Sequence, residues 1–446
     1  MIFRNEGECI PWKNACKAFF TILVVGLVIR IVFMPITSSP FDIGAGWVAI
    51  IDGTYSGDTI YESGWYFYPP VWGYILSIIS SIADLVGMGS LGAVFPSIYD
   101  GQILTIGHGL LTNLGFNFLV KIPALIFDVL TGLVAYELVK KLTGSQKKAV
   151  IGFALWFLAP VVIMSSSILG MFDSIMIFLM MLSLLTFMNK KYFLTGTLMS
   201  IAFFTKIFAI FLIPVMVAYI MSERDVELKE RYKNLLYASL GFALVGILIY
   251  LPAILTGEFM DSLTFFTMRN DTYADAGGFQ FSPTFNNVFF YFPLLIAVYV
   301  AIFAYMFTRR EEREKNFLWL VVLSIIPIFA LPFVAYTPTY GITLLPAILI
   351  LFSFKGKIAY IPWVLIFLFP IHGILHYWET LFYPLAAFTD LLDINSIVER
   401  FPNGFIYDLV NWIAFIPGMS IVIITAHYAA KKKEVYPWIK TRLRLA

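Results

Sequence analysis

Residues 18–47 read AFFTILVVGLVIRIVFMPITSSPFDIGAGW. Residues 18–36 of this stretch are almost all apolar and are long enough for one helix to cross a bilayer. Asp42 follows the apolar run directly, which predicts a carboxylate at the membrane surface. No small-residue cleavage site follows the run, so we interpret 18–36 as an anchor and not as a removable signal peptide.

The composition of the whole chain agrees with this segment. Its 446 residues are 60% hydrophobic and only 13% charged, whereas soluble domains are about half apolar and a quarter charged. The chain is therefore predicted to be an all-α polytopic membrane protein. A net charge of +2 and two cysteines exclude a nucleic-acid binder and a disulfide scaffold.

Hydropathy predicts about twelve transmembrane helices. Segment 192–221 is long enough for a short hairpin and is counted as two spans. The predicted series is 18–36, 116–139, 149–166, 171–188, 192–221, 234–253, 286–308, 316–335, 341–354, 358–376 and 405–428.

Segment 69–88 is also long enough to cross, but its polar residues lie at helical spacing on one side, which predicts an interfacial amphipathic helix. If it does not cross, 25 of the 30 Lys and Arg residues fall on the inner side and both termini are cytosolic, as the positive-inside rule requires. The first outer loop then runs over 37–115, with six acidic residues and no Lys or Arg. Further outer loops are 254–285 and 377–404.

Five basic residues do not fall on the inner side. Three lie within spans, near their outer ends, where an ionisable group is costly and needs a physical reason. Their shared depth suggests a phosphate site; the alternative is that they reach the headgroups or pair with Asp128 or Asp173. The five are Arg30, Lys121, Lys206, Arg269 and Arg400.

Asp42 and Asp173 are predicted to face outward at the same depth. A carboxylate beside a bound phospho-compound suits a general base that takes the proton of an attacking hydroxyl. The alternative is that each caps the helix that follows it.

Other candidate side chains lie in the aromatic first outer loop and near the C-terminus. Tyr68 is either part of an interfacial aromatic belt or a platform for a sugar ring. His108 is either an acid/base group or an interface residue. His372 and His376 are spaced to bind a metal on one helical face, but the sequence shows no third ligand.

The ordered motifs resemble the integral-membrane GT-C glycosyltransferases, and within them the mannosyltransferase-like members, including those that act on glycolipids. The resemblance covers roughly residues 20–290. It rests on Asp42, Asp52-Gly53-Thr54-Tyr55, Tyr68-Pro69-Pro70, Lys121-Ile122-Pro123 with Asp128, Gly170-Met171-Phe172-Asp173-Ser174 and Thr205-Lys206.

The resemblance implies a seven-span module with juxtamembrane helices in the first outer loop and a further such loop after the seventh span. With the hydropathy and charge pattern, this divides the chain into a cytosolic stub (1–17), the seven-span module (18–253) with loop 37–115, a C-terminal helical module (254–428) and a basic cytosolic tail (429–446). The resemblance also implies transfer of a sugar, usually with inversion, from a polyprenyl or dolichyl phosphate to a lipid-linked or protein-linked acceptor on the non-cytosolic face.

Residue roles combine this resemblance with the placement of charges and aromatic residues. Asp42 matches the family's probable base. Lys121, Lys206, Arg30 and Arg269 are the candidate phosphate ligands. Asp173 matches a second acidic position that in different members binds a metal, contacts the acceptor or is structural; Tyr68 and His108 are further candidates for acceptor, sugar or metal contact. No cofactor is implied firmly, although a divalent cation is compatible, and the metal site is unknown.

One departure is that Tyr336-Thr337-Pro338-Thr339-Tyr340 lacks the Arg of the relatives' late motif, which Arg269 is positioned in the sequence to replace. The rival function is a lipid or solute transporter or flippase, which predicts midplane charges and symmetric halves. Two further functions compatible with the sequence are an inert envelope scaffold and a ligase that joins whole glycans.

Overall fold

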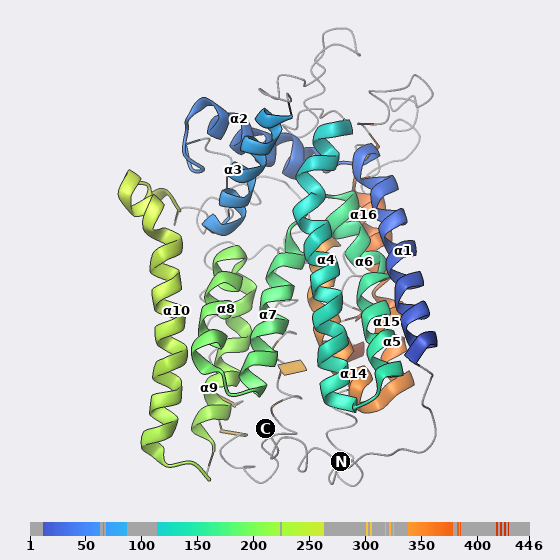
Figure 1. Ribbon diagram of the computed structural model, residues 1–446, viewed down its shortest axis with the longest axis vertical. Helices are drawn as coiled ribbons and strands as arrows, with labels where there is room; N and C mark the ends of the chain where they lie inside the picture. Colours follow the sequence, from blue (N-terminus) through green and yellow to red (C-terminus); the bar gives the residue numbers. More distant parts are fainter. Residues whose placement is uncertain are drawn as a thin grey trace.

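The computed structural model describes residues 12–62, 66, 68–86, 114–223, 225–262 and 338–377, with single residues or pairs elsewhere between 300 and 427. Within these ranges the chain forms helices joined by turns and no β-strand, which confirms the predicted helical class. The longer helices run side by side, and the short helices α2 and α3 lie together near one end of the bundle (Figure 1).

The described part of the chain contains α-helices and shorter π- and 3-10 helices. They are α1 (Trp12–Ile36), the π-helix η1 (Pro40–Trp47), α2 (Val48–Ser56), α3 (Pro70–Leu85), α4 (Leu114–Thr143), α5 (Gln146–Phe157), α6 (Pro160–Ile163), the π-helix η3 (Met164–Ile168), α7 (Asp173–Met188), α8 (Tyr192–Thr205), the 3-10 helix η4 (Ile207–Leu212), α9 (Ile213–Met221), α10 (Leu228–Thr256), the 3-10 helix η8 (Pro338–Leu344), α14 (Leu345–Lys355), the 3-10 helix η9 (Gly356–Ala359), α15 (Tyr360–Leu365) and α16 (Leu368–Tyr377).

Four helical runs among the described residues are long and apolar enough to cross a membrane, namely Ala15–Ile36, Leu114–Thr143, Leu228–Thr256 and Thr339–Ile371. A fifth results if α5 and the bent segment Pro160–Ile168, which meet at 43°, form one span. The chain is thus a membrane protein by its helices, but the predicted count of twelve is not confirmed. Most of 286–308, 316–335 and 405–428 lies outside the described residues.

Segment 192–221 is a hairpin. At its turn, Lys206 Nζ lies 2.6 Å from an oxygen of Asp173, the first residue of α7. At the other end, Lys190 follows α7 and pairs at 3.9 Å with Glu223, which follows α9. The chain therefore leaves one end of the bundle at Lys190, turns at Lys206 and returns. Each limb is shorter than a full crossing requires.

Helix α3 corresponds to the predicted interfacial segment 69–88. Its 16 residues extend for about 24 Å, which is less than the roughly 30 Å hydrocarbon core. Its polar side is divided: Ser80 donates to the carbonyl of Ile51 at 2.8 Å and Ser77 lies 3.3 Å from Thr54 of α2, while Asp84 is exposed. Its short length and its place at the bundle end fit an interfacial helix (Figure 1).

The two-module division of the chain stays a prediction, because most of 263–337 lies outside the described residues. The structure does show that the later segment packs into the earlier one. Tyr340, in η8, is fully buried, and the indole of Trp363 donates to the carbonyl of Leu155 in α5 at 2.8 Å.

Candidate active site

Lys206 and Asp173 form a buried ion pair at the turn of the hairpin. Lys206 follows α8 in an extended conformation, with φ −157° and ψ 132°, so its side chain leaves the helix and points toward the start of α7. Its Nζ lies 2.6 Å from Asp173 Oδ1, and the two side chains are 2% and 0% exposed. The sequence offered this pairing as the alternative to a free cation.

Four aromatic rings surround the Lys206 ammonium, and we call them the Lys206 enclosure. Their centroids lie 4.4 Å (Tyr340), 5.3 Å (Phe172), 5.7 Å (Phe208) and 6.0 Å (Tyr68) from Nζ. Ring faces attract a cation, more strongly where water is excluded. The enclosure joins the segment before α3, the segment before α7, the hairpin turn and η8.

The Lys206–Asp173 pair leaves polar atoms without partners. An ammonium group has three N–H donors, and within the described part of the chain Lys206 has a single hydrogen-bond acceptor, Asp173 Oδ1. Asp173 Oδ2 and the hydroxyl of Thr339 are likewise buried without a described partner. Buried ion pairs normally need further hydrogen bonds to offset desolvation, so this pair has capacity to bind a polar ligand.

Asp42 lies in η1, which packs against the segment that leads to Asp173. Its Oδ2 accepts a hydrogen bond from Ser39 Oγ at 2.8 Å, and its side chain is 8% exposed. At the other end of η1, the indole of Trp47 donates to the carbonyl of Gly170 at 3.2 Å and its ring packs against Phe172. The structure thus brings together the segments that carry Asp42 and Asp173.

The phenol of Tyr66 ties together the loop that carries Tyr68. Tyr66 donates through its hydroxyl to the carbonyl of Pro69 at 2.7 Å and accepts from the backbone N–H of Gly73 at 2.6 Å. Burial raises the pKa of Tyr66 well above its ordinary value and that of Tyr74 to about 12. Both phenols therefore stay neutral at physiological pH.

Lys121, a predicted phosphate ligand, is fully buried and bound to backbone oxygens. Its Nζ donates to the carbonyls of Met34 (2.9 Å), Thr37 (2.6 Å) and Ile168 (2.9 Å). All three ammonium protons have acceptors, two of them at the C-terminal end of α1, where a lysine is favourable. In this structure Lys121 ties α1 to η3.

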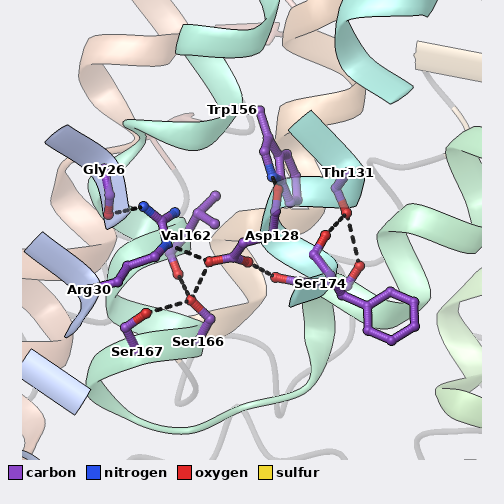
Figure 2. A network of polar contacts seen from close by, with 10 residues as sticks. Gly26, Arg30, Asp128, Thr131, Trp156, Val162, Ser166, Ser167 and Ser174 are labelled. Carbon is purple, nitrogen blue, oxygen red and sulfur yellow. Dashed lines mark hydrogen bonds and ion pairs between the residues drawn. The ribbon is translucent and has the colours of Figure 1, made fainter. Parts of the chain in front are cut away.

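Arg30, also a predicted phosphate ligand, forms a second buried ion pair (Figure 2). Its Nε lies 2.8 Å from Asp128 Oδ2, and both side chains are fully buried. Ser166 and Ser174 also hydrogen-bond the Asp128 carboxylate, and the Arg30 guanidinium lies 4.1 Å from the Phe157 ring centre. This network joins α1, α4, η3 and α7.

Two predicted site residues, Arg269 and His108, lie outside the described residues, as do the side chains of His372 and His376. Within the described chain no three His, Cys, Asp or Glu side chains lie close enough together to hold a metal ion. Asp173 contacts Lys206 and not a second carboxylate. The described residues therefore do not fit a metal site.

Sequence reasoning missed the roles of Phe172, Phe208, Tyr340 and Ser39. Phe172 precedes Asp173 in a quoted motif, and Tyr340 ends the stretch noted for its missing Arg. Their proximity to Lys206 and Asp42 had no signal in the sequence, because aromatic residues are common throughout this chain.

Residues 102–251 match the family model described as dolichyl-phosphate-mannose-protein mannosyltransferase. The match confirms the predicted resemblance to GT-C glycosyltransferases and indicates a membrane glycosyltransferase of the mannosyltransferase type. It includes both buried ion-pair carboxylates, Asp128 and Asp173, with Lys121 and Lys206, and it excludes Asp42 and Tyr340. No curated protein gives a significant match to the chain.

Proposed function

We propose that this protein transfers a hexose, such as mannose, from a polyprenyl or dolichyl phosphate to a lipid-linked or protein-linked acceptor. The family match supports the reaction class. The observation that carries the proposal is the buried Lys206–Asp173 pair, whose ammonium keeps two N–H donors without an acceptor among the described residues. A phosphate oxygen is the kind of acceptor that such donors bind.

Lys206 is the proposed ligand of the donor phosphate. The aromatic rings around it exclude water, and electrostatic attraction is stronger where water is excluded. A fixed cation there would also stabilise the phosphate as it leaves, which is where charge develops in the transition state. Lys121 and Arg30 already have internal partners, so their proposed contribution is structural, while Arg269 remains a candidate from outside the described residues.

Asp42 is the proposed general base. In a single displacement, the acceptor oxygen forms a bond to C1 of the sugar while the bond from C1 to the phosphate oxygen breaks. The acceptor proton passes to Asp42, and the electron pair leaves with the prenyl phosphate. Attack opposite the leaving group inverts C1. Tyr68 is the proposed platform for the sugar ring, and no step is routed through a metal.

The proposed topology places both termini in the cytosol and the active site on the outer face. Lys141 donates to Asn189 at 2.5 Å, and Lys190 pairs with Glu223, so these basic loops share one end of the bundle. Lys206 and Asp173 lie at the opposite end of α7 and α8. This separation supports the positive-inside orientation.

The test is the Asp42→Asn variant of the full chain, purified in detergent and supplied with radiolabelled polyprenyl phosphate mannose and membrane acceptors. We expect transfer to fall at least about a hundredfold, the usual contribution of a general base, while prenyl phosphate binding persists. The control is Asp84→Asn, which removes an exposed carboxylate of α3. Near-normal transfer by Asp42→Asn would contradict the assignment of Asp42 as the general base. Solute uptake into proteoliposomes without any sugar transfer would favour a transporter.

A further inference from the structure

Among the described residues, the carboxylates of two buried ion pairs differ in how completely they are hydrogen-bonded. Asp128 accepts from Arg30, Ser166 and Ser174. Asp173 accepts from Lys206 alone among the described residues, and its second oxygen is buried without a partner. The first carboxylate has the surroundings of a structural group. The second stands beside the one ammonium that we propose for phosphate binding.

We propose that Asp173 sets the charge selectivity of this phosphate site, so that the monoester product is held less tightly than Lys206 alone would hold it. This inference rests on the proposed function. The donor is a phosphodiester with one negative charge, whereas the prenyl phosphate product is a monoester with about −1.5 to −2 at pH 7. Transfer therefore increases the negative charge beside Asp173.

Geometry brings the two anions close together. A phosphate oxygen that accepts from Lys206 Nζ shares this nitrogen with Asp173 Oδ1, which lies 2.6 Å from it. Two acceptors on one tetrahedral ammonium are about 4–5 Å apart, a distance at which like charges in a water-poor site repel strongly. The four rings of the Lys206 enclosure carry no charge that offsets this repulsion.

The repulsion has a use in turnover. Lys206 attracts both the donor and the product. The Asp173 carboxylate repels both as well, but it repels the product more strongly because the product carries more negative charge. Asp173 thus makes the site nearly neutral and limits product inhibition. A neutral side chain at position 173 would convert the site into a net cation, which favours the dianionic product.

The experiment compares the binding of farnesyl phosphate, a monoester, with that of its methyl diester to the purified full chain in detergent. Asp173→Asn and Asp173→Ser both remove the charge, and both residue types are accepted at helix starts. The matched control is Glu223→Gln, which removes the carboxylate paired with Lys190 at the opposite end of the bundle. The double variant Asp173→Asn/Lys206→Met removes the cation without leaving a buried unpaired charge.

We expect either neutral variant to raise the ratio of monoester affinity to diester affinity about tenfold, and Glu223→Gln to leave it unchanged. An unchanged or lower ratio in a monodisperse Asp173→Asn or Asp173→Ser protein overturns the inference, provided that the double variant has lost affinity for both ligands. If the double variant binds both ligands as the parent does, the phosphate site itself is wrongly assigned and the proposed function fails with it.

Discussion

Lys121 and Lys206 are both buried lysines near the same end of the helix bundle, but their ammonium groups have different surroundings. Lys121 donates to three carbonyl oxygens, whereas Lys206 has one carboxylate and four ring faces. A cation whose protons are all bound to the protein holds the fold together. A cation that keeps N–H donors without a protein acceptor is suited to bind a ligand.

At this residue scale, Lys121→Met should lower stability without weakening prenyl phosphate binding. The variant leaves three buried carbonyls without a donor, and we expect it to lower the free energy of unfolding by about 3 kcal/mol or more, because each unsatisfied buried group costs about 1–3 kcal/mol. Thermal unfolding and ligand binding are measured on the purified protein, with Lys148→Met, at an exposed lysine, as control. A large loss of affinity at unchanged stability would instead restore Lys121 as a phosphate ligand.

Gly170 is a second single-residue test. It has a φ of 70°, and an added Cβ would lie 2.5 Å from Ile43 Cδ1, next to Asp42. We expect Gly170→Ala to cost about 1–3 kcal/mol and to reduce transfer by displacing η1. Gly57 has a φ of 97° but open space around it, so Gly57→Ala should share the strain and keep the activity. Equal transfer rates in the two variants would show that η1 tolerates the shift.

At the scale of elements, α8 and α10 cross at close range through a glycine on each helix. An added Cβ at Gly196 would lie 1.9 Å from the carbonyl oxygen of Ala238, and one at Gly241 would lie 2.2 Å from that of Phe193. Small residues let membrane helices approach to backbone contact. This crossing fixes the hairpin whose turn presents Lys206.

We therefore expect Gly241→Ala to destabilise the protein by about 1–3 kcal/mol, because the helices must separate and backbone cannot move aside. Gly246→Ala is the matched control on the same helix, since its Cβ would meet the Phe204 side chain, which can rotate. The stabilities of the two variants are compared by thermal unfolding in the same detergent. If Gly246→Ala lowers the stability more than Gly241→Ala does, the close contact between α8 and α10 at Gly241 does not determine the crossing.

At the scale of the whole molecule, the Arg30–Asp128 network joins residues 98 positions apart in the chain. It lies inside the bundle and connects α1 with α4, while Ser174 connects it to the start of α7 (Figure 2). Ser174 is the chain neighbour of Asp173. The network therefore fixes the helices on which the candidate site is built.

Removing Arg30 alone should lower the stability of the protein more than removing Arg30 and Asp128 together. Arg30→Met leaves a buried carboxylate without its cation, for which we expect a loss of about 3–5 kcal/mol, whereas Arg30→Met/Asp128→Leu should recover most of it. Unfolding midpoints of parent, single and double variants measure the difference. A double variant as unstable as the single one would mean that the two serine hydrogen bonds, and not the ion pair, hold the network.

The sequence left 192–221 open between one span and a hairpin, and the interfacial position of 69–88 stays a prediction. The membrane class and the helical architecture were predictable from it. Each depends on hydropathy and on charge spacing within a short stretch of chain, which are local properties. The sequence also named Asp128 and Asp173 as possible partners of the buried cations.

Only the tertiary structure decided which cation has which surroundings. Lys121 finds its acceptors at Thr37 and Ile168, 84 and 47 positions away, and Lys206 meets Tyr340 from the far half of the chain. Whether a buried charge is satisfied depends on carbonyls, hydroxyls and rings that distant segments bring to it. Neither hydropathy nor spacing records those contacts, so the sequence grouped three cations whose surroundings differ in the fold.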